Sequence, residues 1–270
     1  MAYRLLALDL DGTLLRGDHT VDPRDVAAIA ELQAAGVVVT IVTGRLHSGA
    51  VAAARACAIE GVIACMEGSH LIDLATGATV AHHPLADAAT ARWRAAVDAH
   101  DLAGFVLDAD GIHHDHRGAP YAGYVATWSP NLRVVGADDA RAIAALATVA
   151  IGERDAVAAA HASMAAAADP TYAVQFAVGA HPGKHAVLTR AAGPTKGTAL
   201  AALCEAAGCT LADAVAVGDW VNDVPMFAVA GRSFAMGGAP DDVRARATDQ
   251  LATPAGAGGG IAEAIRRAWG

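Results

Sequence analysis

The chain alternates short, continuously apolar runs with longer alanine-rich segments. Residues 3–10 form a near-continuous apolar run, which is typical of a strand buried on both faces. Residues 37–42 and 62–65 predict two further buried strands. Helices are predicted over 23–35, which has a proline in its first turn, and over 46–58. This order of strands and helices predicts a parallel, doubly wound α/β sheet.

The middle of the chain has a different pattern. Residues 71–80 predict a hairpin, and the segment after it mixes helix signals with shorter, more polar strand signals. We expect helices over 85–100, 137–148 and 153–168, and strands over 171–178 and 185–190. After Pro194 the buried pattern returns, with helices predicted over 196–207, from about 222, and up to 269, and strands over 214–217 and 233–236.

This return of the first pattern predicts two domains, one of them discontinuous. Residues 1–82 and 187–270 would form an α/β core, and residues 83–186 would form an inserted α+β domain. An insertion at a loop tip is well tolerated because it leaves the packing of the host domain intact. The 270 residues are 54% apolar and 17% charged, which is enough apolar material for a substantial core.

Composition and charge narrow the class of partner. The formal net charge of −9 argues against a nucleic-acid-binding protein, because such proteins need clustered lysine and arginine. It does not exclude a small anionic substrate, since a bound divalent cation can reverse the local field. The four cysteines have no CxxC or zinc spacing, and no signal peptide or membrane segment is indicated. These features predict a reduced, cytoplasmic protein without a membrane partner.

The first polar cluster, Asp9-Leu-Asp-Gly-Thr13, ends the first predicted strand. Asp9 and Asp11 are two residues apart on an extended chain, so their carboxylates face the same side, and Gly12 permits a sharp turn. Adjacent like charges are costly unless a cation or a shared proton offsets them. Because oxygen-only ligands suit Mg²⁺, the pair indicates a magnesium site. The alternative is a solvated acidic turn.

Two further clusters offer groups that could hold phosphate. Thr43-Gly44-Arg45 follows the second predicted strand and supplies a hydroxyl and backbone N–H groups, although such a sequence alone is more often a turn. Lys196 opens a predicted helix, where its charge opposes the helix dipole. This unfavourable position indicates that the Lys196 charge has an electrostatic role outside its own helix.

The fourth cluster, Gly218-Asp-Trp-Val-Asn-Asp223, follows the strand predicted over 214–217. Asp219 ends the strand, while Asn222 and Asp223 open the next helix. An ordinary helix N-cap explains Asn222 and Asp223 but leaves Asp219 without a reason. All four clusters lie where buried strands end or on the helix that follows, and that edge is where ligands bind in open α/β sheets.

Together these motifs resemble the haloacid dehalogenase (HAD) superfamily, in particular its Cof-type phosphatases. That family has DxDGT, a threonine after the second strand, a lysine before a helix and GDxxND, which correspond here to Asp9–Thr13, Thr43, Lys196 and Gly218–Asp223. The resemblance covers both ends of the chain. It implies an α/β fold with a doubly wound parallel-sheet HAD core and an inserted α+β cap domain.

The resemblance also implies roles for the acidic residues. Asp9 would attack phosphorus and form an acyl phosphate, and Asp11 would act as general acid and then general base. Mg²⁺ would be held by the Asp9 carboxylate, the Asp11 backbone carbonyl and Asp219. Asp223 would support Lys196 or the metal site without binding the ion directly.

A second set of residues would bind the phosphate group by the same resemblance. Thr43, Gly44 and Lys196 would hold its non-bridging oxygens and meet the charge of the transition state. Arg45 and Asn222 are the remaining predicted substrate-binding residues.

The predicted activity is that of a Mg²⁺-dependent phosphoric monoester hydrolase acting on a small phosphorylated metabolite. Few aromatic residues in the inserted segment favour sugar phosphates over stacked bases. One alternative is a phosphotransferase or phosphomutase acting on sugar phosphates. Another is a non-hydrolytic phosphoacceptor, a regulatory domain of about half this length. The sequence gives no indication of the oligomeric state.

Two features leave substrate recognition open. Cof-type sequences usually have Asn-Gly-Ala after the third strand, whereas this chain has Glu67-Gly-Ser, which bears on substrate contacts or on the junction with the cap. The segment 82–185 also holds nine of the twelve histidines. In the string His113-His-Asp-His116, His114 and His116 would share one face of a strand. We prefer a polar strand or cavity wall to a zinc site there.

Overall fold

The computed structural model describes residues 3–136, 139, 143–166 and 171–270. The chain forms two compact units. The first comprises Met1–Gly44, Ala50–Ala81 and Pro194–Gly270, and the second comprises Arg45–Gly49 and His82–Gly193. Among the described helices, none has the length and apolar character that a membrane crossing would require.

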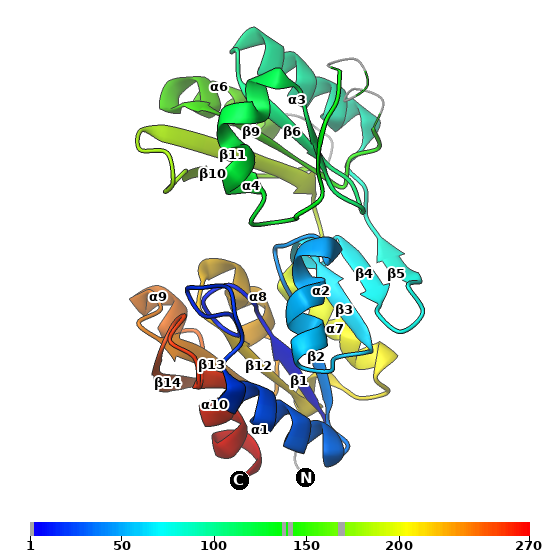
Figure 1. The fold of residues 1–270 in the computed structure, drawn as a ribbon, viewed down its shortest axis with the longest axis vertical. Coiled ribbons are helices and arrows are strands. Elements are labelled where there is room, and N and C mark those ends of the chain that lie inside the picture. Colours follow the sequence, from blue (N-terminus) through cyan, green and yellow to red (C-terminus); the bar gives the residue numbers. More distant parts are fainter. Residues whose placement is uncertain (1–2, 137–138, 140–142, 167–170) are drawn as a thin grey trace. The chain divides into compact units, whose positions relative to one another are not determined.

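The first unit is an α/β structure (Figure 1). Its strands are β1 (Leu5–Leu8), β2 (Val38–Ile41), β3 (Val62–Cys65), β4 (His70–Asp73), β5 (Thr79–His82), β12 (Ala214–Gly218), β13 (Arg232–Gly237) and β14 (Asp249–Pro254). Its helices are α1 (Pro23–Ala34), α2 (His47–Ala56), α7 (Lys196–Ala206), α8 (Val224–Phe227), α9 (Asp241–Arg244) and α10 (Gly260–Trp269). Short 3₁₀ turns are formed by Met66–Gly68, Leu211–Asp213 and Val221–Asp223.

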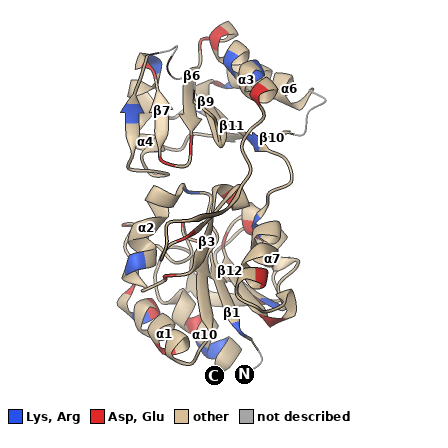
Figure 2. Cartoon of the chain, turned by 90° about the vertical axis from the view of Figure 1, so that its right-hand side faces the viewer, with Lys and Arg blue, Asp and Glu red and all other residues tan. Residues whose placement is uncertain are grey.

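A five-stranded parallel sheet, in the order β14-β13-β12-β1-β2, organises this unit. Leu6 and Leu8 pack in a core with α1, α2 and α10, while Leu5 and Ala7 pack in a separate core with α7 and α8. Both faces of β1 are therefore buried, which explains its uninterrupted apolar run. Figure 2 shows β1 and β12 without a charged residue. The predicted α/β class with a parallel sheet is confirmed.

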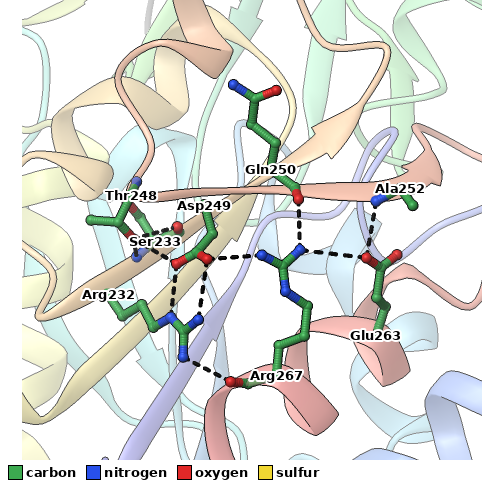
Figure 3. A network of polar contacts seen from close by, with 8 residues as sticks. All are labelled: Arg232, Ser233, Thr248, Asp249, Gln250, Ala252, Glu263 and Arg267. Atoms are coloured by element: carbon green, nitrogen blue, oxygen red, sulfur yellow. Dashed lines mark hydrogen bonds and ion pairs between the residues drawn. The ribbon is translucent and has the colours of Figure 1, made fainter.

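A polar network ties the edge strand β14 to β13 and α10 (Figure 3). The Arg232 guanidinium donates to both carboxylate oxygens of Asp249, at 2.8 and 3.1 Å, and Arg267 donates to the same carboxylate at 2.8 Å. The Glu263 carboxylate accepts from the backbone N–H groups of Ala252 and Thr253 at 2.9 and 3.0 Å. These bonds hold a polar edge strand that has little apolar surface of its own.

The second unit is an α+β structure with a six-stranded sheet in the order β10-β11-β9-β6-β7-β8. Its strands are β6 (Ala103–Leu107), β7 (Ile112–His114), β8 (Leu132–Val134), β9 (Ala147–Glu153), β10 (Thr171–Ala177) and β11 (Lys184–Ala191). Its helices are α3 (Asp87–Ala99), α4 (Ala122–Val125) and α6 (Arg154–Ala165), with a 3₁₀ turn over His116–Tyr121. Neighbouring strands are antiparallel except β7 and β8, which are parallel. Apolar residues of α3 and α6 pack with those of the sheet in one core.

Three elements depart from the sequence prediction. β3, predicted as a strand of the parallel sheet, instead pairs antiparallel with β4 in a separate three-stranded sheet of the order β3-β4-β5. The helix predicted over 137–148 is wrong over 143–148, because residues 143–146 are not helical and residues 147 and 148 begin β9; residues 137, 138 and 140–142 lie outside the described part of the chain. The edge strand β14 was not predicted at all. Its sequence is polar and ends in proline, which suits an edge but weakens the strand signal.

Candidate active site

The first strand brings Asp9 to the carboxyl edge of the parallel sheet. β1 ends at Leu8, and the Asp9 N–H extends the ladder by donating to the Val217 carbonyl oxygen at 3.0 Å. The side chain of Asp9 is buried. The turn that follows requires Gly12, which has a φ of +84° and where a Cβ would lie 2.4 Å from Oδ2 of Asp219. The turn therefore brings the backbone against a second carboxylate.

Asp219 directly follows β12 at the same edge of the sheet. The Thr13 hydroxyl donates to Oδ1 of Asp219 at 3.0 Å, so the first and fourth sequence motifs are in contact. Burial, and next the negative charge of Asp223, raise the pKa of Asp219 to about 6. Both effects disfavour the negatively charged form of the Asp219 carboxyl group.

Asp223 is fully buried, and both of its carboxylate oxygens accept hydrogen bonds. Oδ2 accepts from the backbone N–H groups of Asp219 and Trp220 at 2.8 and 2.9 Å. Oδ1 accepts from the Lys196 ammonium at 2.6 Å. Asp223 therefore fixes the loop that carries Asp219 and at the same time anchors a lysine from another helix.

Lys196 is the cation of the site and is completely buried. Its Nζ donates to Oδ1 of Asp9 at 2.6 Å as well as to Asp223. Burial opposes the charged ammonium, but the charges of Asp223, Asp9 and Glu67 outweigh it and raise the pKa of Lys196. The unfavourable position at the start of α7 is thus compensated by three carboxylates from other segments.

The acidic side chains fit a divalent cation. One ligand atom from each of Asp9, Asp219 and Asp223 lies within 4.8 Å of the other two. Burial, together with the charges of Asp223 and Asp219, raises the pKa of Asp9 well above its ordinary value, even though Lys196 acts in the opposite direction. A single ammonium does not balance three carboxylates, and oxygen donors of this kind suit a hard divalent ion. Because Asp223 already uses both oxygens, Asp9 and Asp219 are the side chains best placed to bind it.

Glu67 joins the predicted phosphate-binding segments to one another. Thr43, just beyond β2, donates its N–H to the Ala64 carbonyl oxygen at 2.9 Å and accepts from the Glu67 N–H at 3.0 Å. A Cβ on Gly44 would lie 2.8 Å from Oε1 of Glu67. The same oxygen accepts from Nδ2 of Asn222 at 2.8 Å. Sequence reasoning noted Glu67 only as a departure from the family, although a carboxylate at a strand end was a signal for a site residue.

The remaining two predicted residues are Asp11 and Arg45. Asp11 is exposed, in the turn between Asp9 and Thr13, and its carboxylate is not one of the three clustered side chains. Arg45 belongs to the second unit, where its guanidinium donates to the Gly49 carbonyl oxygen at 3.3 Å.

The histidine-rich string of the second unit has a different arrangement from the predicted one. β7 ends at His114, and His116 begins the following 3₁₀ turn, so the two do not share a strand. A ring nitrogen of His113 contacts Asp108 at 2.7 Å, and one of His114 contacts the Asp115 carbonyl oxygen at 2.8 Å. Within the described residues, these histidines form no group of three metal-binding side chains.

Comparison with known proteins identifies the family. The model of the haloacid dehalogenase-like hydrolases matches residues 6–265. The chain belongs to this family. The HAD hydrolase is 29% identical over 264 residues to pyridoxal phosphate phosphatase YbhA of Escherichia coli (strain K12), covering 92% of each chain. It is 37% identical over 71 residues to the HMP-PP phosphatase of Serratia proteamaculans (strain 568), which is 26% of each chain.

Solved structures match this HAD hydrolase over nearly its whole length. A haloacid dehalogenase-like hydrolase from Bacteroides thetaiotaomicron has a TM-score of 0.86 at 22% identity, covering 98% of this chain and 99% of the other. A sugar phosphatase of HAD subclass IIB has a TM-score of 0.80 at 18% identity, covering 98% of both chains. At these identities the likeness concerns the fold.

The family match and its phosphatase relatives confirm the predicted class of enzyme, a HAD-type phosphatase. The predicted fold, a HAD core with an inserted cap domain, is also confirmed.

Proposed function

We propose that this HAD phosphatase hydrolyses small phosphate monoesters with Mg²⁺, through an aspartyl-phosphate on Asp9. The observation that carries the proposal is the contact of the Lys196 ammonium with Asp9 at 2.6 Å, beside the carboxylate of Asp219. An anionic nucleophile that must approach a phosphate dianion needs positive charge close by. The Lys196 ammonium provides one such charge, and the carboxylates of Asp9 and Asp219 could bind a cation that provides another.

The proposed chemistry begins with attack by a carboxylate oxygen of Asp9 on phosphorus, as the bond to the leaving oxygen breaks. Asp11 gives its proton to that oxygen and then accepts a proton from the water that hydrolyses the acyl phosphate. The exposure of Asp11 is compatible with exchange of protons with solvent. Lys196, held in place by Asp223, stays charged in both steps and stabilises the negative charge of the phosphoryl group.

Mg²⁺ would be held by the carboxylates of Asp9 and Asp219 and by the backbone carbonyl of Asp11, with Asp223 fixing the loop. When bound, it screens the repulsion between nucleophile and phosphate. Thr43, Gly44 and Asn222 would hold the non-bridging oxygens, and Arg45 remains a proposed substrate contact.

We also propose that residues 1–82 and 187–270 act as the catalytic core and that 83–186 act as a cap that excludes water and selects the leaving group.

Sugar phosphates are our first choice of substrate. Pyridoxal phosphate is a second candidate, because the phosphatase of that name is similar to this chain over 92% of its length.

The proposal is tested by measuring phosphate release from a panel of phosphorylated metabolites, with Mg²⁺ and with chelator, by wild type and by Asp9→Asn. We expect hydrolysis only with Mg²⁺, sugar phosphates among the best substrates, and no release by the folded variant. Appreciable turnover by Asp9→Asn would contradict the assigned nucleophile. Selective hydrolysis of pyridoxal phosphate would favour the second substrate.

A further inference from the structure

Glu67 is an acidic residue of this site for which the proposed mechanism has no use. It lies in a 3₁₀ turn in which three successive residues, Met66, Glu67 and Gly68, have positive φ values of 47°, 58° and 93°. Side chains other than glycine rarely adopt this conformation, and it persists only where surrounding structure imposes it. Here a Cβ on Gly68 would lie 2.9 Å from Cβ of Ala199 on α7, so the turn is packed tightly against that helix.

This turn directs the Glu67 carboxylate at the proposed phosphate-binding groups. Its Oε1 accepts from the Asn222 amide at 2.8 Å and lies against Gly44, while the Glu67 N–H is bonded to the Thr43 carbonyl oxygen at 3.0 Å. The negative charge also acts on the ammonium of Lys196. All of these contacts lie within the first unit.

A carboxylate in this position has a predictable electrostatic effect. It opposes every additional negative charge brought in with the phosphate, and it can accept a hydrogen bond from a hydroxyl or an ammonium group. Two unit charges about 7 Å apart in a medium of effective dielectric constant about 20 change an equilibrium by a few tens of fold. A hydrogen bond to Asn222 alone would not require a charged residue, because glutamine would provide the same oxygen.

We propose that Glu67 is a specificity-determining residue that selects phosphate monoesters with a neutral hydroxyl or a cationic group near the phosphate and rejects those with a second anionic group. The inference rests on the proposed function. It defines the substrate class as polyol or amino-alcohol monoesters, as opposed to diphosphates and phosphorylated carboxylic acids.

The test compares three small monoesters of similar size and different charge: 2-aminoethyl phosphate, 2-hydroxyethyl phosphate and 2-phosphoglycolate. Each is measured as a substrate or, where turnover is slow, as a competitive inhibitor of p-nitrophenyl phosphate hydrolysis. Wild type is compared with Glu67→Gln, whose amide oxygen can still accept from Asn222. Glu60→Gln, at an exposed position of the same unit, is the matched control for the change in net charge.

We expect wild type to prefer 2-aminoethyl phosphate over 2-phosphoglycolate, and Glu67→Gln to reduce that ratio by at least about tenfold. For 2-hydroxyethyl phosphate, kcat/KM (or the inhibition constant, where turnover is slow) should change by less than about threefold in Glu67→Gln. Glu60→Gln should leave this quantity as in wild type for all three compounds. An unchanged ratio in Glu67→Gln would overturn the inference. So would an equal loss for all three compounds, which would show a purely positioning role.

Failure of the proposed function has a different signature. If wild type releases no phosphate from any monoester in a manner that depends on Asp9, the phosphatase proposal falls and the inference falls with it. If Asp9-dependent hydrolysis is present and only the charge preference is unaffected by Glu67→Gln, the inference alone is refuted.

Discussion

At the scale of single residues, the carboxylate oxygens of the site accept several hydrogen bonds from Lys196 and from the backbone. Asp223 uses both oxygens, one for Lys196 and the other for two backbone N–H groups. Asp9 gives Oδ1 to Lys196. The Lys196 ammonium is thereby held between Asp223 and Asp9, the residue proposed to react.

Replacing Asp223 with asparagine should reveal this double function. Asparagine has one acceptor oxygen, so either Lys196 or the N–H groups of Asp219 and Trp220 lose their partner. We expect the free energy of unfolding to fall by about 1–3 kcal/mol in urea titrations. We also expect kcat/KM to fall on the order of 10²–10³, because Lys196 is no longer held.

Asp242→Asn, at an exposed position on α9, is the matched control and should behave as wild type. An Asp223→Asn enzyme with wild-type stability and activity would show that the buried contacts of Asp223 carry no function.

The meeting of Asp9, Lys196 and Asp219 was predictable, whereas other contacts of the site were not. Asp9 and Asp219 were indicated by their positions at strand ends, and Lys196 by its charge at the start of a helix. Nothing in the spacing indicated that Glu67 would bond Asn222, 155 residues away. Such a pairing depends on a turn with positive φ at two non-glycine residues, Met66 and Glu67, a conformation that local sequence rarely specifies.

At the scale of secondary-structure elements, prediction succeeded where both faces of a strand are buried. β3 coincides with the predicted residues 62–65, and β1 and β2 lie within their predicted ranges. β9 was misread because alanine favours helices locally, while its place between β11 and β6 imposes an extended conformation. Tertiary context outweighed local preference in that segment.

The glycine-rich stretch before α10 also has an element-scale explanation. The buried Asp25 of α1 accepts from the N–H groups of Gly259 and Ala262 at 2.8 Å each. Gly259 itself has a φ of +85°, which suits glycine at the start of this helix. A carboxylate from α1 therefore satisfies N–H groups at the first turn of α10 and holds the end of this stretch.

The network around β14 predicts a pH dependence of stability (Figure 3). Hydrogen bonding by Arg232 lowers the pKa of Asp249 below its ordinary value. A carboxyl group with a lowered pKa in the folded state contributes stability above its unfolded pKa, about 3.9, and loses it as pH falls through the folded value. We expect urea titrations of Asp249→Asn to show lower stability at neutral pH and a smaller loss of stability on acidification.

Asp242→Asn, which removes an exposed aspartate with no network of this kind, should follow the wild-type pH profile. An unchanged acid dependence in Asp249→Asn would mean that Asp249 titrates alike in the folded and unfolded states.

At the scale of the whole molecule, the parallel sheet is what makes a site from distant segments. Asp9 and Lys196 are 187 positions apart, and they meet because β1 and β12 end at the same edge while α7 begins beside them. This convergence was predictable from the order of strands and helices. Substrate preference was not, because the inserted segment lacks family motifs and the role proposed for Glu67 has no counterpart in those motifs.

The central claim, a covalent phosphoryl group on Asp9, is tested most directly with Asp11→Asn and p-nitrophenyl phosphate. This leaving group needs no proton, so the variant should form the acyl phosphate but lack the base that helps water to remove it.

We measure the release of p-nitrophenol in a rapid-quench experiment, reduce the quenched protein with borohydride, and analyse its peptides by mass spectrometry. The account predicts a burst of p-nitrophenol equal to the enzyme concentration, and homoserine at position 9. Turnover without modification of Asp9, or with modification at any other residue, would contradict it.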